Sequence, residues 1–430
     1  MLRGILAVLS GAIVSQAIGI GALPLLARLY SPEAFGALQI YMSAIGVLMM
    51  FTTLRYEVAI LLPEDRTELA HLVWLCVVLN VALTPLLALL VWAWTRSGIP
   101  GAALDKLWYW LLPPAFLVGG LLQTWTYLPI RLRDYPASAR AKLAQTLGYV
   151  SAAGLLGLFN PSSLGLIVSD IAGRTLSLAS IARLTPSEAI YGRRPRLADL
   201  VRTVRRFEHY PLFVFPSTLL SAANAALVPY LVFWLFGLAS AGQYALVDRS
   251  IGLAAGMLGA ALSQVFTGEF AERLRAADGS ANRLFRRTVG VLAAISIGPV
   301  LLVAIFAPQL FGVVFGAQWA LAGELARIMV FVAMTSFVTA PVNMVLLLCS
   351  RQRLQLAWQA ANFVTSVLVW GLVYLLEYHD LLWAIGLYAA CAILLNLVFL
   401  VMADRVSATA PGNLAGQRAP TDHNQRPNPS

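Results

Sequence analysis

Long apolar runs alternate along the chain with short polar segments that contain most of its charges. The runs have the length of membrane-spanning helices, and they show no alternation of apolar and polar positions with a period of two. A helix needs roughly 20 apolar residues to cross a bilayer, whereas barrel strands show that alternation over about 10 residues. The pattern therefore predicts an all-α, polytopic membrane protein.

Twelve runs are long enough to span a membrane, so we expect about twelve transmembrane helices. Their ranges are 4–27, 36–62, 70–94, 107–130, 143–159, 162–182, 210–236, 241–267, 288–307, 322–349, 354–376 and 381–403. The first run continues to Ala27, which is too long for the apolar core of a signal peptide, so we expect an uncleaved helix. Asn160 and Pro161 separate the fifth run from the sixth and predict a tight hairpin.

Lysine and arginine are distributed unequally between the two sides that these spans define. Of the 30 basic residues, 23 lie on one side, 3 lie on the other, and 4 lie within spans. Basic residues of short loops favour the cytoplasmic side. The count predicts that the N-terminus, the C-terminus and the arginine-rich loops face the cytoplasm.

The longest polar segment between spans, 183–209, divides the runs into two sets of six. We therefore expect a six-helix lobe over 1–182, a basic cytoplasmic linker over 183–209, and a second six-helix lobe over 210–403. Residues 404–430 are rich in Pro, Gly, Asn and Gln, which is typical of a disordered tail.

The two predicted lobes repeat some features in the same order. Pro24 precedes Gly36 in the first lobe, and Pro229 precedes Gly242 in the second. Because each lobe has an even number of spans, both have the same orientation, and the repeat is parallel. Such a repeat places a shared site between the lobes, near the middle of the membrane.

Composition supports a membrane protein and gives no sign of a metal or cofactor. Hydrophobic residues make up 59% of the chain, charged residues 12%, and the mean hydropathy is +0.76. The net charge of +10 resides mainly in loops, so we expect no nucleic acid partner. The three cysteines and four histidines lack the spacing of a disulfide framework or a metal site, so no metal or cofactor is expected.

Charged side chains inside the spans are the candidate site residues, because each costs on the order of 2.5–3.5 kcal/mol at the bilayer centre. Arg249 lies about eight residues into the eighth span, or roughly 12 Å from its end. Its guanidinium has the planar geometry that binds a diphosphate, and the alternative is a structural pair with a neighbouring helix. Asp248 points about 100 degrees away from it.

Two other pairs of charges lie within spans and have two interpretations each. Asp170 and Arg174, at i and i+4, can neutralise each other or line a cavity. Arg55 and Glu57 lie near the cytoplasmic end of the second span, where they can snorkel to the interface or face a cavity.

Two segments resemble a known family of transporters. RLYSPEAFG at 28–36 and LRYEVAILLP at 54–63 are similar to Wzx-type oligosaccharide flippases, of the superfamily that includes the lipid II flippase and the MATE exporters. The resemblance implies that the protein moves an undecaprenyl-diphosphate-linked oligosaccharide to the outer leaflet of the bacterial inner membrane, by alternating access around a cationic cavity. The product would serve surface polysaccharide or lipopolysaccharide biosynthesis.

The resemblance also implies roles for individual residues and partners. Arginines of the first, second and eighth helices line the cavity in related flippases, which adds Arg28 to Arg55 and Arg249. With Arg174 these are the expected substrate-binding residues. The acidic residues that could couple an ion are Glu57, Asp170 and Asp248. Expected partners are the lipid-linked oligosaccharide diphosphate and membrane lipids, with polysaccharide polymerase and glycosyltransferases as further candidates.

Two other functions share this architecture. A MATE-like cation-coupled exporter would be expected to have acidic residues facing its cavity, and the first span has none. A membrane enzyme acting on lipid-linked sugars would need a sizeable outer loop, and the longest one predicted, 95–106, is short. We therefore expect a transporter and not an enzyme.

Overall fold

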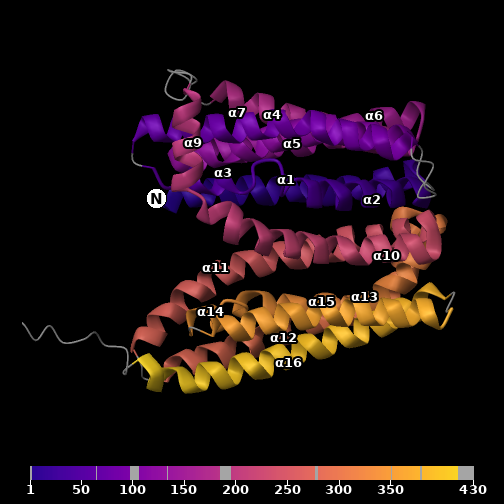
Figure 1. The fold of residues 1–430 in the computed structure, drawn as a ribbon. Coiled ribbons are helices and arrows are strands. Elements are labelled where there is room, and N and C mark those ends of the chain that lie inside the picture. The colour runs from indigo at the N-terminus through magenta and orange to yellow at the C-terminus, as the bar shows by residue number, and fades with distance from the viewer. Residues whose placement is uncertain are drawn as a thin grey trace, which may run out of the picture. The chain divides into compact units, whose positions relative to one another are not determined.

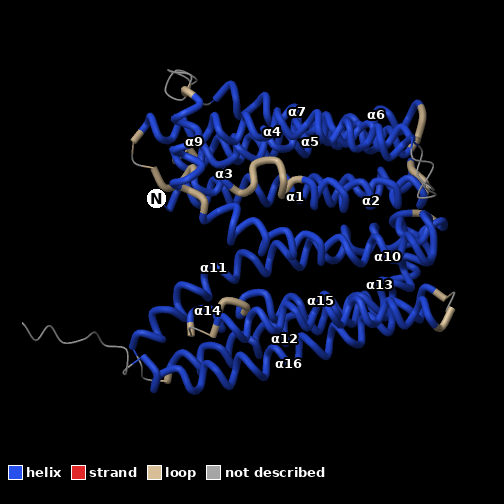
Figure 2. Tube along the Cα trace, in the orientation of Figure 1, coloured by secondary structure: helices blue, strands red, loops and turns tan. Residues whose placement is uncertain are grey.

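The computed structural model describes residues 2–63, 65–96, 106–132, 134–184, 195–276, 279–349, 351–377 and 380–414, and these residues form helices and connecting loops without strands (Figures 1 and 2). The predicted all-α class is confirmed. The chain divides into two compact units. Unit 1 comprises Met1–Ser250 and Pro308–Gly323, and unit 2 comprises Ile251–Ala307 and Glu324–Ser430.

The helices follow the predicted spans closely. They are α1 Leu2–Leu29, α2 Pro32–Leu48, α3 Tyr56–Ala59, α4 Arg66–Arg96, α5 Lys106–Leu132, α6 Tyr135–Phe159, α7 Ser163–Leu184, α9 Leu197–Arg206, α10 Phe215–Val247, α11 Leu253–Ala276, α12 Ser280–Phe315, α13 Ala320–Val342, α14 Val345–Leu348, α15 Gln352–Leu375 and α16 Leu381–Leu414. The described residues also form two short π-helical segments, η1 Tyr210–Val214 and η2 Asp248–Gly252, and one 3-10 turn, η3 Ala317–Trp319.

Two of the predicted helix boundaries are visible as breaks in the backbone. Gly237 has a φ of 84° inside α10, which separates the predicted seventh and eighth spans. The hairpin at Asn160 lies between α6 and α7. Within the described residues, seven helices are long and apolar enough by themselves to cross a membrane. The protein is thus a multi-pass membrane protein.

The second predicted span is not one helix, contrary to the expectation of a continuous run over 36–62. Helix α2 ends at Leu48, and Leu54 and Arg55 adopt left-handed conformations with φ of 50° and 68° before α3 begins. Two threonines take part in the break, because their hydroxyls form local hydrogen bonds that compete with those of a helix. Thr52 Oγ1 donates to the Met49 carbonyl at 2.8 Å, and Thr53 Oγ1 donates to Glu57.

A close crossing of two helices joins α2 to the C-terminal part of α10. A Cβ atom on Gly36 would lie 1.9 Å from the Leu238 carbonyl oxygen, and one on Gly242 would lie 1.8 Å from that of Pro32. The contact is reciprocal, because each glycine faces the carbonyl four residues before the other. Gly36 and Gly242 are also the residues that the predicted repeat matches with each other.

The basic linker and the tail are more ordered than the composition suggests. Helix α9 forms the second part of the predicted linker, and residues 185–194 lie outside the described residues. Helix α16 continues to Leu414, so residues 404–414 of the expected disordered tail are helical, and 415–430 lie outside the described part. Asp404 explains this extension, because it accepts hydrogen bonds from Arg286 Nε at 2.8 Å and Nη2 at 2.9 Å on α12.

The core of unit 2 lies among α11, α12, α14 and α16. Its fully buried aromatic and aliphatic side chains include Phe270, Phe285, Val345 and Phe399. Ser407 is also fully buried and receives a hydrogen bond from Asn282 at 2.7 Å. Helix α16 is therefore held against α12 well beyond the end of its apolar run.

Candidate functional site

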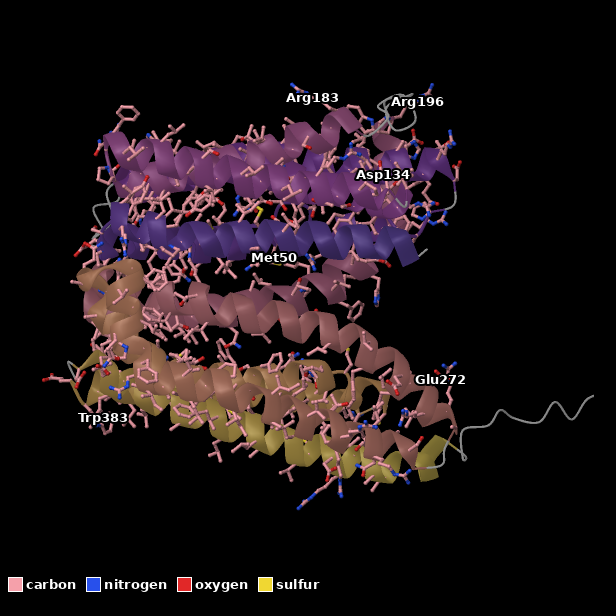
Figure 3. All side chains as sticks on the ribbon, turned by 180° about the vertical axis from the view of Figure 1, so that it is seen from behind. Met50, Asp134, Arg183, Arg196, Glu272 and Trp383 are labelled. Atoms are coloured by element: carbon pink, nitrogen blue, oxygen red, sulfur yellow. The ribbon has the colours of Figure 1, made fainter. Side chains whose placement is uncertain are left out.

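Charged residues inside the helices of unit 1 gather in two places. The Arg249 cluster comprises Tyr41 on α2, Tyr149 on α6, Asp170 and Arg174 on α7, and Arg249 on η2. The Glu57 cluster comprises Thr53, Arg55, Glu57 and Gln123 around the break of the second span. Figure 3 places Met50, at the start of that break, between the two ends of the helices, and Asp134, Arg183 and Arg196 near one end.

Asp170 and Arg174 form a buried ion pair. Arg174 Nε lies 2.7 Å from Asp170 Oδ2, and the exposed fractions of the two side chains are 17% and 8%. The arginine also points its Nη2 toward Met42 Sδ on α2, at 3.8 Å. One helical turn brings the two charges together, as their spacing predicts. The geometry favours the pair interpretation, because the carboxylate neutralises the guanidinium that would otherwise bind an anion.

Arg249 lies in a π-helical turn, where the backbone departs from the α-helix that the sequence predicts. Such turns are rare and frequently occur at functional sites. Ser250 Oγ, within the turn, donates to the carbonyl of Leu246 near the end of α10 at 2.7 Å. Asp248 beside it has an exposed side chain.

The guanidinium of Arg249 is bound by a neutral partner and not by an acid. This guanidinium interacts electrostatically with the hydroxyl of Tyr149, which also lies within electrostatic reach of Asp170. None of the ion pairs within the described residues includes Arg249. Its charge therefore remains available to an anionic ligand, and Tyr149 links it to the neighbouring pair.

Glu57 is fully buried and bound by three donors. Its carboxylate accepts from Arg55 Nη1 at 3.1 Å, from Gln123 Nε2 at 2.6 Å, and from the hydroxyl of Thr53. The Arg55 side chain is 20% exposed. For Glu57 the contacts favour a buried position facing α5 over snorkelling, because its carboxylate accepts a hydrogen bond from Gln123 of that helix.

Arg28 lies apart from both clusters. Its Nε donates to the Val314 carbonyl at 3.1 Å and its Nη2 donates to the Val313 carbonyl at 2.6 Å. These carbonyls belong to the last turn of α12, where no backbone N–H of the helix can reach them. A cation at a helix C-terminus is favourable, so this contact gives Arg28 a capping function.

Sequence reasoning missed the neutral members of the two clusters. Tyr41 and Tyr149 lie within apolar runs, where a tyrosine has no distinguishing pattern, and Thr53 looks like an ordinary β-branched residue. These residues become visible only where helices distant in sequence meet.

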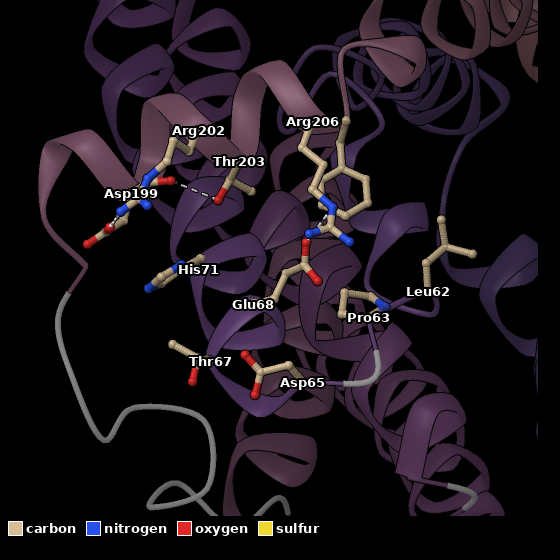
Figure 4. A pocket seen from close by; sticks show the side chains of 11 residues that line it. Leu62, Pro63, Asp65, Thr67, Glu68, His71, Asp199, Arg202, Thr203 and Arg206 are labelled. Atoms are coloured by element: carbon tan, nitrogen blue, oxygen red, sulfur yellow. Dashed lines mark hydrogen bonds and ion pairs between the residues drawn. The ribbon is translucent and has the colours of Figure 1, made fainter.

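A cavity of about 790 Å³ lies between the start of α4 and α9, away from both clusters (Figure 4). Its polar lining includes Glu68 and His71 of α4 and Asp199 and Arg206 of α9. Arg206 Nε pairs with Glu68 Oε1 at 2.9 Å across the cavity. None of the expected site residues lines it.

The two clusters lie in a region of the chain that matches a known protein family. The family model described as polysaccharide biosynthesis protein matches residues 25–324. The chain belongs to this family. The match covers α2, the break of the second span, α7 and Arg249, so both clusters of this polysaccharide biosynthesis protein fall inside the region that defines the family. Among curated proteins no relative matches the chain.

Solved structures share the fold of this polysaccharide biosynthesis protein at low sequence identity. The lipid II flippase MurJ, in an inward closed conformation, gives a TM-score of 0.71 with 11% identity over 98% of this chain and 94% of that one. A multidrug resistance MATE family transporter of the MOP superfamily, in an inward-facing conformation, gives 0.66 with 13% identity over 94% and 96%. A variant of the Vibrio cholerae MATE transporter VcmN gives 0.54 with 16% identity over 97% and 94%.

Proposed function

We propose that the protein is a flippase for an undecaprenyl-diphosphate-linked oligosaccharide, which it moves from the cytoplasmic to the outer leaflet of the bacterial inner membrane. Transport proceeds by alternating access, and the product enters surface polysaccharide or lipopolysaccharide biosynthesis. Membership of the polysaccharide biosynthesis family and the fold shared with a lipid flippase support this class of substrate. Both also favour a transporter over an enzyme.

The position of Arg249 inside a span, without a carboxylate partner among the described residues, is the observation that most supports an anionic substrate. An arginine within a membrane-spanning segment is costly unless it has a partner, and this one has only a tyrosine hydroxyl among the contacts described above. A diphosphate offers two oxygens at the spacing of the guanidinium fork. The polar clusters contain no other arginine that lacks a carboxylate partner.

The proposal gives each of the remaining site residues a different role. Arg174 binds substrate only when Asp170 releases it, since the two lie 2.7 Å apart. Arg55 keeps one guanidinium nitrogen, Nε, buried without a partner in the described structure, which leaves a donor for a ligand. Arg28 holds the end of α12 and contributes through stability.

The contacts of the acidic residues give less support to a cation-coupled exporter than to a flippase. A carboxylate that couples an ion has to be free to bind it, and Glu57 already accepts three hydrogen bonds. Asp170 is paired with Arg174. Asp248 is the ion-coupling candidate whose side chain is exposed, so it is the place where coupling, if used, would act.

The membrane potential is sufficient to drive this export. Two negative charges that leave an inside-negative cell at about 100 mV gain roughly 4.6 kcal/mol. This energy biases the cycle toward the outer leaflet without an ion gradient. The direction depends on the arginine-rich loops facing the cytoplasm, as their charge predicts.

Replacement of Arg249 tests the proposal. Arg249→Ala should lower export of the lipid-linked oligosaccharide by at least about tenfold, because hydrogen bonds to charged groups contribute about 1.5–3 kcal/mol. Arg249→Lys should restore part of it, because an ammonium keeps the charge and loses the fork. Export is measured in cells that depend on this gene and is normalised to inserted protein.

A matched control removes a different arginine from a spanning helix. Arg327→Ala takes a guanidinium from α13 that is paired with Glu324 at 3.2 Å, and it should leave export nearly unchanged. Full export by Arg249→Ala would overturn the assignment of the site. Equal loss of normalised export in both variants would overturn it as well, because the effect would then not be specific to Arg249.

A further inference from the structure

Helix α9 leaves a stripe of apolar side chains uncovered. Leu197, Val201 and Val204 have exposed fractions of 78%, 45% and 38%. Their spacing of four and then three residues places them on one face of the helix. Exposed apolar side chains are unremarkable singly, but three in line on a helix outside the predicted spans form a continuous surface.

The adjacent face of α9 is fixed to the helices beneath it. Leu200 packs against the buried cluster that contains Tyr56 and Leu72, and Phe207, directly after the helix, belongs to that cluster. The Tyr56 hydroxyl donates to the Val204 carbonyl at 3.4 Å. The stripe is therefore held in a defined direction by a helix that is anchored along its other side.

Arginines follow the stripe on the side of the helix that is turned away from Leu200. Arg202 and Arg206 have side chains exposed by 78% and 69%, and Arg205 is also exposed. Arg202 pairs with Asp199 and Arg206 pairs with Glu68, whereas Arg205 takes part in none of the ion pairs of the described residues.

Asp199 also fixes the beginning of the helix. Its carboxylate accepts the backbone N–H of Arg196 at 3.0 Å, and this hydrogen bond lowers the pKa of Asp199, with the nearby Arg202 acting in the same direction. The lowered pKa keeps the carboxylate ionised to a lower pH than that of an ordinary aspartate, so the hydrogen bond at the first turn of α9 persists to that lower pH.

The direction of α9 differs from that of the long helices around it. Figure 1 shows α9 crossing the ends of the helices of unit 1, and Figure 4 shows it passing over the first turns of α4. If α4 crosses the membrane, α9 lies along the surface of that membrane. A helix in the plane of the interface with an apolar stripe and basic flanks has the features of an interfacial amphipathic helix.

We propose that α9 is a binding surface for the cytoplasmic leaflet, in which Leu197, Val201 and Val204 enter the acyl region and Arg202 and Arg205 bind the phosphates of anionic phospholipids. Charge complementarity selects this occupant, because an acidic lipid surface attracts arginines that lie close to it. The proposal depends on the cytoplasmic orientation of the linker and is independent of the transported substrate.

The test uses the full chain in lipid nanodiscs, with the native cysteines replaced and one environment-sensitive fluorophore on a new cysteine. Val201→Cys places the fluorophore on the stripe. Ala198→Cys is the matched control, since Ala198 is exposed on the same helix about 90 degrees from the stripe. Phospholipids brominated in their acyl chains quench a fluorophore that enters the bilayer, and iodide in solution quenches one that does not.

We expect lipid quenching at position 201 to exceed that at 198 by about twofold or more in nanodiscs that contain phosphatidylglycerol. Replacing the anionic lipid by phosphatidylcholine, or Arg202 and Arg205 by Gln, should weaken the difference, and so should 1 M salt. Strong iodide quenching and no lipid quenching at 201 would overturn the proposal. The proposal would also be overturned if iodide quenched the fluorophore at 201 in nanodiscs but not in native membranes, because that result indicates a protein partner. The readout needs no transport, so its failure leaves the proposed substrate untouched.

Discussion

The crossing of α2 and α10 gives the sharpest prediction, because it concerns backbone atoms that cannot rotate away. In Gly36→Ala the new Cβ atom would lie 1.9 Å from the Leu238 carbonyl oxygen and 3.0 Å from the Gly242 nitrogen, whereas ordinary contact begins near 3.4 Å. The two helices therefore have to separate by more than about 1 Å at this point, and a tightly packed membrane interface loses contacts on both sides.

The stability cost of Gly36→Ala can be compared with that of the same substitution at another glycine of α2. A Cβ atom on Gly46 would meet nothing within 4 Å. Gly46→Ala should be neutral or slightly stabilising, because alanine is favoured over glycine in a helix by up to about 1 kcal/mol. The helix-propensity gain applies to both substitutions, and overpacking typically costs about 1–3 kcal/mol, so Gly36→Ala should be less stable than Gly46→Ala by about 1–3 kcal/mol.

The assay is the apparent melting temperature of the detergent-solubilised protein, measured at one heating rate because such unfolding is commonly irreversible. Gly36→Ala should melt several degrees below Gly46→Ala. The reciprocal geometry requires that Gly242→Ala, with its Cβ atom 1.8 Å from the Pro32 carbonyl oxygen, behaves like Gly36→Ala. Equal melting temperatures for Gly36→Ala and Gly46→Ala would refute the close approach of the two backbones.

Three further predictions concern the site and the orientation. Asp170→Ala or Arg174→Ala alone should lower the amount of inserted protein, since breaking a buried ion pair costs about 3–5 kcal/mol. The double variant should recover insertion, and a double variant inserted no better than either single one would contradict the ion pair. Tyr149→Phe should reduce export several-fold with normal insertion, because a hydrogen bond to a charged group is worth about 1.5–3 kcal/mol, and export at the wild-type level would remove Tyr149 from the site. Reporter enzymes fused after Leu197 should be active in the cytoplasm and those fused after Ala317 outside it; an external signal at Leu197 would reverse the predicted topology.

The apolar runs were sufficient to predict the all-α class and most helix boundaries. Each span has to satisfy its own backbone hydrogen bonds in lipid, so its length and composition are local properties. The hairpin at Asn160 and the separation of the seventh and eighth spans follow from local sequence in the same way. The spacing of Asp170 and Arg174 likewise predicted a contact within one helix.

The break of the second span could not be predicted in this way. Its apolar run continues through Thr52 and Thr53, and both residues occur in ordinary helices. What ends the helix is a set of partners that includes Gln123, which lies on α5 and reaches Glu57 at 2.6 Å. A buried carboxylate with three donors stabilises the left-handed residues beside it only after α5 has packed in place.

The sequence alone determined which segments enter the membrane, which loops are basic, and which charges lie inside the spans. The tertiary structure decided what each of those charges meets: Arg28 meets the end of α12, Arg174 meets Asp170, and Arg249 meets the hydroxyl of Tyr149. The physical reason is that the cost of placing a charge in a membrane depends on its own position, whereas the relief of that cost depends on partners from helices distant in sequence.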